Sequence, residues 1–166
     1  LRSSSAASDV YKRQDEIISS HDAIILAGGA EMPRDLPIQG RNFKGIHYAM
    51  DFLPQQNRRV SNESYVNPEE ILATSKNVVV IGGGDTGSDC IGTSIRQGAI
   101  SVTQLEIMPE PPEKEDKLST WPNWPLKLRT SSSQEEGANR EFSVMTQSFE
   151  GDANGNVKKL HCIKVD

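Results

Sequence analysis

Three glycines in the stretch VVVIGGGDTGSDC (78–90) have the spacing G-x-G-x-x-G. In this pattern the first glycine permits a sharp turn, the second lets the backbone approach a pyrophosphate, and the third lets a helix pack close to a strand. The helix then directs its N–H groups and the positive end of its dipole at the phosphates. The spacing therefore predicts a dinucleotide-binding turn, with the Asp85 carboxylate pointing away from the phosphates. We expect the turn to comprise Gly82, Gly83, Gly84, Asp85, Thr86 and Gly87.

An acidic residue stands where a ribose-binding carboxylate is needed. Glu106 follows the last of these glycines by about 20 residues and comes at the end of a second strand-like segment. A carboxylate there accepts hydrogen bonds from the two hydroxyls of the adenosine ribose and repels a 2′-phosphate. The three residues after it supply no cation, which favours NADH over NADPH. Lys127 or Arg129 could fold back and neutralise the 2′-phosphate, which would allow NADPH to bind. Of the cations, Arg129 is the best candidate to contact a nucleotide phosphate.

The segments around the glycines read as a strand, a helix and a second strand. Val78 to Ile81 is an apolar run typical of a buried strand, and residues 101–107 form the next one. Gly98 is placed to end the helix between them. This order predicts an α/β fold with a parallel sheet. The helix face that we expect to be buried consists of Cys90, Ile91, Ser94 and Ile95.

The same residues also allow a purely structural interpretation. A glycine-rich turn can join a strand to a helix without binding anything, and Glu106 can be a solvated carboxylate at the end of a strand. The residues alone leave both alternatives open.

The segment before the glycines predicts two further pieces of secondary structure. Residues 15–30 read as the end of a short helix followed by a buried strand at Ala23 to Ala27, which stops at two glycines. Residues 44–53 have helical spacing of apolar side chains, and we expect Pro54 to end that helix. Residues 55–75 are polar and read as a connector.

The segment after Glu106 predicts a surface excursion and a hairpin. Residues 109–137 contain five prolines, and we expect Trp121 and Trp124 within them to pack the loop onto its own domain, with stacking on an adenine or on a subunit face as the alternative. Ser132 and Glu135 have the spacing of a capping box at the start of a short helix. Strand-like segments on both sides of Asn154-Gly155 predict a β-hairpin over residues 142–165.

The composition restricts the partners. Eighteen Lys and Arg stand against 23 Asp and Glu among 166 residues, so the net charge of −5 gives no reason to expect nucleic acid or an anionic membrane as partner. Cys90 and Cys162 form neither a CxxC pair nor a zinc-ligand set, which indicates a reducing, cytoplasmic setting and no metal site here. The polar residues 1–14 read as a non-native or disordered lead.

Three stretches of the chain resemble the small (beta) subunit of glutamate synthase and the equivalent region of single-chain NADH-dependent enzymes. They are DAIILAGGAEMPRDLPIQGRNFKGIHYAMDFL (22–53), VVVIGGGDTGSDCIGTSIRQGA (78–99) and the pair LEIMPEPP and WPNWPLKLRTSSSQEEG (105–112 and 121–137). The similarity covers nearly all of residues 15–166. Within it, Gln134 replaces a histidine that is common in the family.

The resemblance implies nested FAD and NAD(P)H dinucleotide-binding domains of Rossmann type, both partial in this chain. Residues 15–60 would then be the end of the first half of the FAD domain and the crossover, and residues 61–166 an incomplete NAD(P)H domain. The resemblance also places a backbone segment close to the flavin nucleotide. That segment is Ala27, Gly28, Gly29 and Ala30.

The resemblance further implies the function of an electron-input subunit. In that family, reduced nicotinamide passes a hydride to FAD, and iron–sulfur clusters carry the electrons to a large (alpha) subunit that forms glutamate from glutamine and 2-oxoglutarate. We expect the clusters only in an N-terminal part that this chain lacks, and we nominate no catalytic side chain because this segment positions cofactors. Another flavoprotein with the same nested domains, or a non-catalytic nucleotide-binding module, is the alternative.

Overall fold

The computed structural model describes residues 14–25, 32–63 and 69–166, and the chain divides into two units, Leu1–Met32 and Pro33–Asp166. In the first unit, α1 (Gln14–Ser20) confirms the predicted short helix. The strand predicted from Ala23 is absent from residues 23–25, which are irregular and exposed. The reason is that a strand needs a hydrogen-bonded neighbour, and none pairs with these described residues; the rest of that segment lies outside them.

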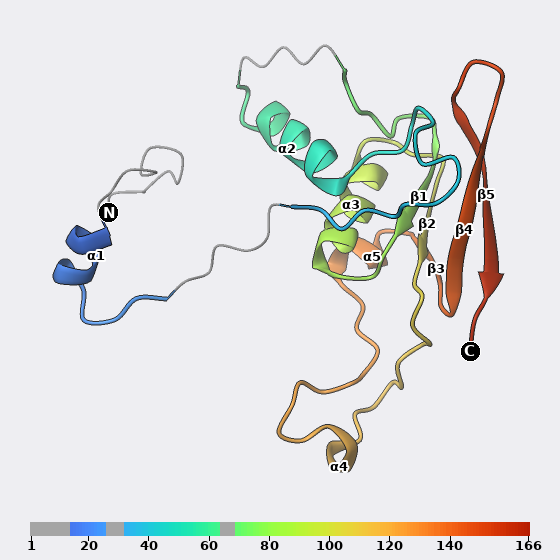
Figure 1. The fold of residues 1–166 in the computed structure, drawn as a ribbon. Helices are drawn as coiled ribbons and strands as arrows, with labels where there is room; N and C mark the ends of the chain where they lie inside the picture. Colours follow the sequence, from blue (N-terminus) through green and yellow to red (C-terminus); the bar gives the residue numbers. More distant parts are fainter. Residues whose placement is uncertain (1–13, 26–31, 64–68) are drawn as a thin grey trace. The chain divides into compact units, whose positions relative to one another are not determined.

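A three-stranded parallel sheet organises the second unit. Its order is β1 (Asn77–Ile81), β2 (Ser101–Leu105) and β3 (Asn139–Glu141), and α3 (Asp85–Arg96) connects the first two strands (Figure 1). The predicted strand–turn–helix–strand unit and the α/β class are therefore confirmed. Strand β3 was not predicted, because its residues Asn-Arg-Glu have no apolar pattern and their position depends on pairing with β2.

The connecting helix α3 packs against β1 and β2 with the face that its sequence predicts. Cys90, Ile91 and Ser94 are buried, and Ile95 is partly buried. Gly98 follows the helix with φ +83° and donates its N–H to the Ile95 carbonyl at 2.9 Å, so the predicted glycine end is confirmed.

Helix α2 (Ala49–Val60) packs on α3 and continues beyond Pro54, so the predicted helix end is wrong. Proline removes only one intrahelical bond here, and contacts of the following turns hold the helix. The Gln55 Oε1 accepts the Ile71 N–H at 3.1 Å, and Arg59 pairs with Glu70 at 3.1 Å. Tertiary contacts have outweighed the local preference.

The C-terminal segment forms the predicted antiparallel hairpin, β4 (Val144–Gly151) and β5 (Val157–Lys164). Gly155 in its turn has φ +78°. The hairpin is bonded to the segment before α2, because isolated bridges join Gln39 to Ser148 and Lys44 to Asn156.

The proline-rich excursion leaves the sheet after β2 and carries α4 (Lys117–Thr120) before it returns through α5 (Ser132–Glu135) (Figure 1). The capping box of α5 lies one residue earlier than predicted. Ser131 caps the helix, and Gln134 occupies the third helical position. The Gln134 side chain accepts the N–H of the capping residue, which is the hydrogen bond that was predicted for Glu135. Among the described residues, no helix has both the length and the apolar character needed to cross a membrane.

Candidate functional site

The glycine turn joins β1 to α3, and the backbone of its first and second motif glycines, Gly82 and Gly84, is accessible to a ligand. Gly82 has φ +117°, a conformation that favours glycine, and its N–H donates to the Leu105 carbonyl at 2.9 Å. Gly84 caps α3 without any side-chain hydrogen bond, and a Cβ added to it would meet nothing within 4 Å. The sharp turn is therefore confirmed, and the space beside Gly84 suits the close approach of a ligand.

The third motif glycine allows the helix to approach the turn. A Cβ on Gly87 would lie 2.6 Å from the Gly82 carbonyl oxygen, which is too close for any larger residue. The predicted role of Gly87 in close packing is confirmed.

The N-terminal end of α3 presents backbone donors beside this turn. The Ser88 N–H bonds to the Gly84 carbonyl at 3.0 Å, so the N–H groups of the residues before Ser88 have no earlier carbonyl within the helix. Asp85 and Thr86 in this first turn are exposed. Together with the positive end of the helix dipole, these donors make the N-terminal end of α3 favourable for binding an anion such as a phosphate.

Glu106 lies directly against the glycine turn. A Cβ on Gly83 would overlap the Glu106 carboxyl group, so a larger residue at that position would have to displace this carboxyl group. The Glu106 side chain is only 16% exposed, and its Oε1 accepts a hydrogen bond from Arg140 Nη2 at 3.1 Å. Glu106 is therefore a held carboxylate, and the solvated alternative is wrong.

Arg140 is a site residue that was not predicted from the sequence. It lies on β3 in register with Gln104 of β2, which brings its guanidinium next to the carboxyl end of β2. Its Nη1 donates to the Arg129 carbonyl at 3.0 Å, and its guanidinium lies 4.9 Å from the Phe142 ring centre. A strand assignment for residues 139–141 was the only signal that could have found it. Its charge offsets that of Glu106, which weakens the sequence argument for NADH.

A groove of about 660 Å³ extends from the glycine turn along β1. This volume lies within the range of about 300–1,000 Å³ that is usual for small-molecule sites. Gly82, Gly84, Thr86 and Gly87 line one part of it, and residues 45–49 and 70–73 line another.

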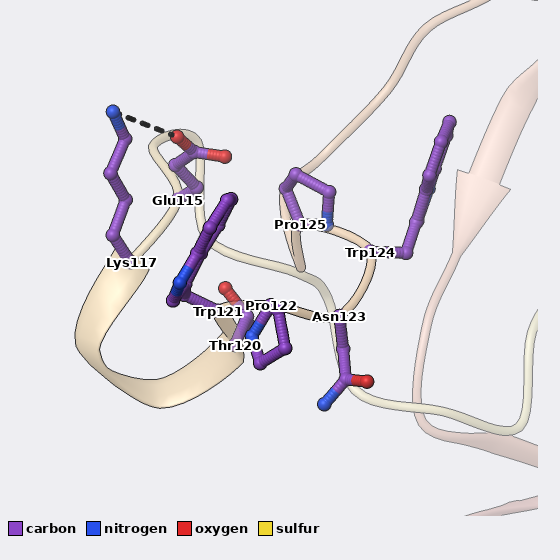
Figure 2. Close-up of a pocket in the computed structure, with 8 residues that line it drawn as sticks. All are labelled: Glu115, Lys117, Thr120, Trp121, Pro122, Asn123, Trp124 and Pro125. Carbon is purple, nitrogen blue, oxygen red and sulfur yellow. Dashed lines mark ion pairs between the residues drawn. The ribbon is translucent and has the colours of Figure 1, made fainter.

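Arg129 and the two tryptophans belong to the excursion. Figure 2 shows Trp121 beside the Glu115–Lys117 ion pair and Trp124 beyond Pro125. These residues line a pocket of about 420 Å³. The Arg129 guanidinium stacks 4.3 Å from the centre of a Trp124 ring. The tryptophans are 81% and 77% exposed, so the prediction that they pack the loop onto its own domain is wrong. Contact of Arg129 with a phosphate stays a prediction.

The remaining predicted residues divide into two groups. Ala27, Gly28, Gly29 and Ala30 lie outside the described residues. Cys90 is buried as predicted, and this burial raises the pKa of its thiol to about 11, with a smaller contribution from Asp89. Within the described part of the chain, no group of three or more His, Cys, Asp or Glu is arranged to hold a metal ion.

Comparisons with known proteins agree with this geometry. A sequence model described as pyridine nucleotide-disulphide oxidoreductase matches residues 4–123. A glutamate synthase (NADPH) small chain of Mycobacterium tuberculosis is 46% identical over 154 residues, which are 91% of this chain and 31% of that protein. A glutamate synthase (NADPH) small chain of Bacillus subtilis is 39% identical over 92% of this chain and 32% of its own length.

A glutamate synthase (NADH) of Schizosaccharomyces pombe is 42% identical over 92% of this chain, which corresponds to 8% of that protein. The chain thus spans about a third of the small chains that it matches. Relatives of comparable identity carry different nicotinamide coenzymes in their names.

Proposed function

Because the chain belongs to the pyridine nucleotide-disulphide oxidoreductase family, we propose that it provides the nicotinamide-nucleotide site of a glutamate synthase electron-input unit. The observation that carries this proposal is the glycine turn. It combines a helix start without a side-chain cap, open space beside Gly84, and a held carboxylate at the end of the neighbouring strand.

These residues fit a dinucleotide. The N–H groups at the start of α3 would donate to the pyrophosphate, where no Cβ stands in the way. The Glu106 Oε1 is engaged by Arg140, and the carboxylate retains acceptor capacity for the ribose hydroxyls. Asp85 would point away from the pyrophosphate. When both cofactors are bound in the whole protein, they would supply hydride transfer from reduced nicotinamide to FAD.

The rest of the assembly is proposed from the relatives. Residues 15–60 would complete part of a nested FAD domain, with Ala27 to Ala30 close to the flavin nucleotide, and residues 61–166 would form part of the NAD(P)H domain. We propose that iron–sulfur clusters lie in a more N-terminal part of the whole protein and that its partner is a cytoplasmic large subunit that forms glutamate.

The Gly84→Val variant of the full-length protein tests the proposal. A valine side chain enters space that is empty in this structure, so the fold should tolerate it while the pyrophosphate cannot approach. We expect NADH and NADPH to lose the ability to reduce the flavin in rapid-mixing absorbance measurements. The control is Ala153→Val, which places a valine side chain in the exposed hairpin turn.

Unchanged flavin reduction in Gly84→Val would reject the proposed site. Nucleotide binding to the wild-type protein without any flavin reduction would instead favour the non-catalytic nucleotide-binding module.

A further inference from the structure

Two buried glutamine side chains form a continuous hydrogen-bonded connection behind the glycine turn. Gln134 Nε2 donates to Gln104 Oε1 at 2.8 Å, and Gln104 Nε2 donates to the Gly82 carbonyl at 3.0 Å. At the other end, Gln134 Oε1 accepts the Ser131 N–H at 2.9 Å. Gln104 is 0% exposed and Gln134 is 8% exposed. We name these two residues the glutamine pair.

The hydrogen bonds of the glutamine pair all run in one direction. Donation passes from the Ser131 N–H through Gln134 and Gln104 to the Gly82 carbonyl. A buried amide that loses a partner is strongly disfavoured, because water cannot replace that partner. The pair therefore holds one orientation of the Gly82 carbonyl.

The orientation of this carbonyl determines that of the next N–H group. In a planar trans peptide, the C=O of Gly82 and the N–H of Gly83 point in opposite directions. Since the carbonyl points at the buried Gln104, the Gly83 N–H points away from it. Two consecutive glycines could otherwise rotate this peptide with little steric resistance.

The short helix α5 also contacts α3, the helix that begins at the glycine turn. The Ser131 and Ser88 hydroxyls are hydrogen-bonded to each other, and Arg96 pairs with Glu136. A Cβ on Gly92 would lie 2.6 Å from the Ser133 Oγ, so the two helices are in close contact. Residues far along the chain thus support both the turn and α3.

We propose that Gln104 and Gln134 are positioning residues for nucleotide binding. By fixing the Gly82–Gly83 peptide, the glutamine pair keeps the backbone donors of the turn in the arrangement that the pyrophosphate requires. This inference rests on the proposed function, because it assigns a role at the same turn.

The test compares Gln104→Met and Gln134→Met in the full-length protein. Methionine keeps a similar volume and removes the amide. The matched control is Gln55→Met, because Gln55 is also buried, at 7% exposure, and holds the Ile71 N–H in the α2 region instead of the turn. For each variant we would measure the Kd of NADH and NADPH by fluorescence titration, the KM and kcat, and the free energy of unfolding.

We expect Gln104→Met to raise the Kd and KM roughly tenfold, the effect of one buried hydrogen bond, with a smaller change in kcat. Gln134→Met should raise them less. The double variant should resemble Gln104→Met alone, because both residues act through one carbonyl. Gln55→Met should lower stability and leave the Kd unchanged.

The proposal is overturned if the Met variants lower stability as Gln55→Met does and leave the Kd unchanged. If a Met variant does not fold, Gln134→Asn keeps the amide but shortens its reach, and the same Kd comparison decides. Gly84→Val distinguishes failure of the proposed nucleotide site from failure of the positioning role. An unchanged Kd in Gly84→Val rejects the proposed nucleotide site. If Gly84→Val loses nucleotide binding and the Met variants bind normally, only the positioning role is rejected.

Discussion

Arg140 Nη2 lies 3.1 Å from Glu106 Oε1, and the two side chains are 17% and 16% exposed. This pair stands at the carboxyl end of β2, beside the turn where the adenosine ribose of a dinucleotide would lie. An isolated carboxylate there would repel a 2′-phosphate, but a carboxylate paired with a guanidinium presents almost no net charge. The coenzyme preference therefore depends on both residues.

Replacing Arg140 with methionine should shift the preference toward NADH. The Glu106 charge would then be unbalanced, and we expect kcat/KM for NADPH to fall about tenfold relative to NADH, as for the loss of one charge-assisted hydrogen bond. The measurement is the ratio of kcat/KM for the two coenzymes in the full-length protein. Arg41→Met is the control, since Arg41 is also little exposed, at 18%, and pairs with Asp35 and not with Glu106.

The reciprocal variant, Glu106→Ala, should move the ratio the other way, because it removes the ribose acceptor and releases Arg140 for a phosphate. A ratio that stays the same in both variants would remove this pair from coenzyme selection.

Replacing Gly83 with alanine should destabilise the fold through Glu106. The added Cβ overlaps the Glu106 carboxyl group and disturbs its pairing with Arg140. Because the contacted atoms are the far end of a flexible side chain, we expect a loss of about 1 kcal/mol in urea unfolding, at the low end for overpacked sites. Gly84→Ala is the control, because its Cβ meets nothing within 4 Å. Adding Glu106→Ala to Gly83→Ala should recover part of the loss, and no recovery would mean that the strain lies elsewhere.

The two cysteines should differ in their reaction with thiol reagents. Burial raises the pKa of Cys90 to about 11, so near neutral pH almost none of it is the reactive thiolate. Cys162 is exposed. Iodoacetamide labelling followed by peptide mass spectrometry should find Cys162 modified and Cys90 protected, with Cys90 labelling rising as the pH approaches its pKa. Rapid labelling of Cys90 in the folded protein near neutral pH would contradict its packed position.

The hairpin turn should weaken in acid because of Asp152. The Asn156 backbone N–H bonds to its carboxylate and lowers its pKa, and the Asn154 N–H bonds to the same oxygen. A depressed pKa stabilises the fold above the unfolded value of 3.8, and this contribution disappears as the pH falls through the folded value. Amide exchange at Asn154 and Asn156 should therefore accelerate, after correction for intrinsic rates, over that acid range. In the Asp152→Ala variant, exchange at these two amides should be fast at every pH. If its exchange rates depended on pH as those of the wild-type protein do, Asp152 would be excluded as the cause.

Local signals predicted the parts of this fold that depend on neighbouring residues. The apolar run before Gly82, the glycine spacing and the Asn154-Gly155 turn each specify their own backbone, so β1, α3, β2 and the hairpin could be foreseen. Arg140 and the glutamine pair could not, because they reach the turn through strand pairing and through a helix about 30 residues further along the chain. The continuation of α2 past Pro54 could not be predicted either, because it depends on contacts of Gln55 and Arg59 with residues 70 and 71.

The bonds between the hairpin and the segment before α2 bear on how the chain matures. Lys44 exchanges backbone hydrogen bonds with Gly155 and Val157 at 2.8 and 2.9 Å, and Gln39 receives one from Phe149 at 2.8 Å. The partners are separated by more than a hundred residues, so closing these contacts requires a large loss of chain entropy. During synthesis, residues 39–44 must wait for nearly all of this sequence to leave the ribosome before they find their partners. Until then the backbone groups of residues 39–44 lack these partners and are exposed to other chains.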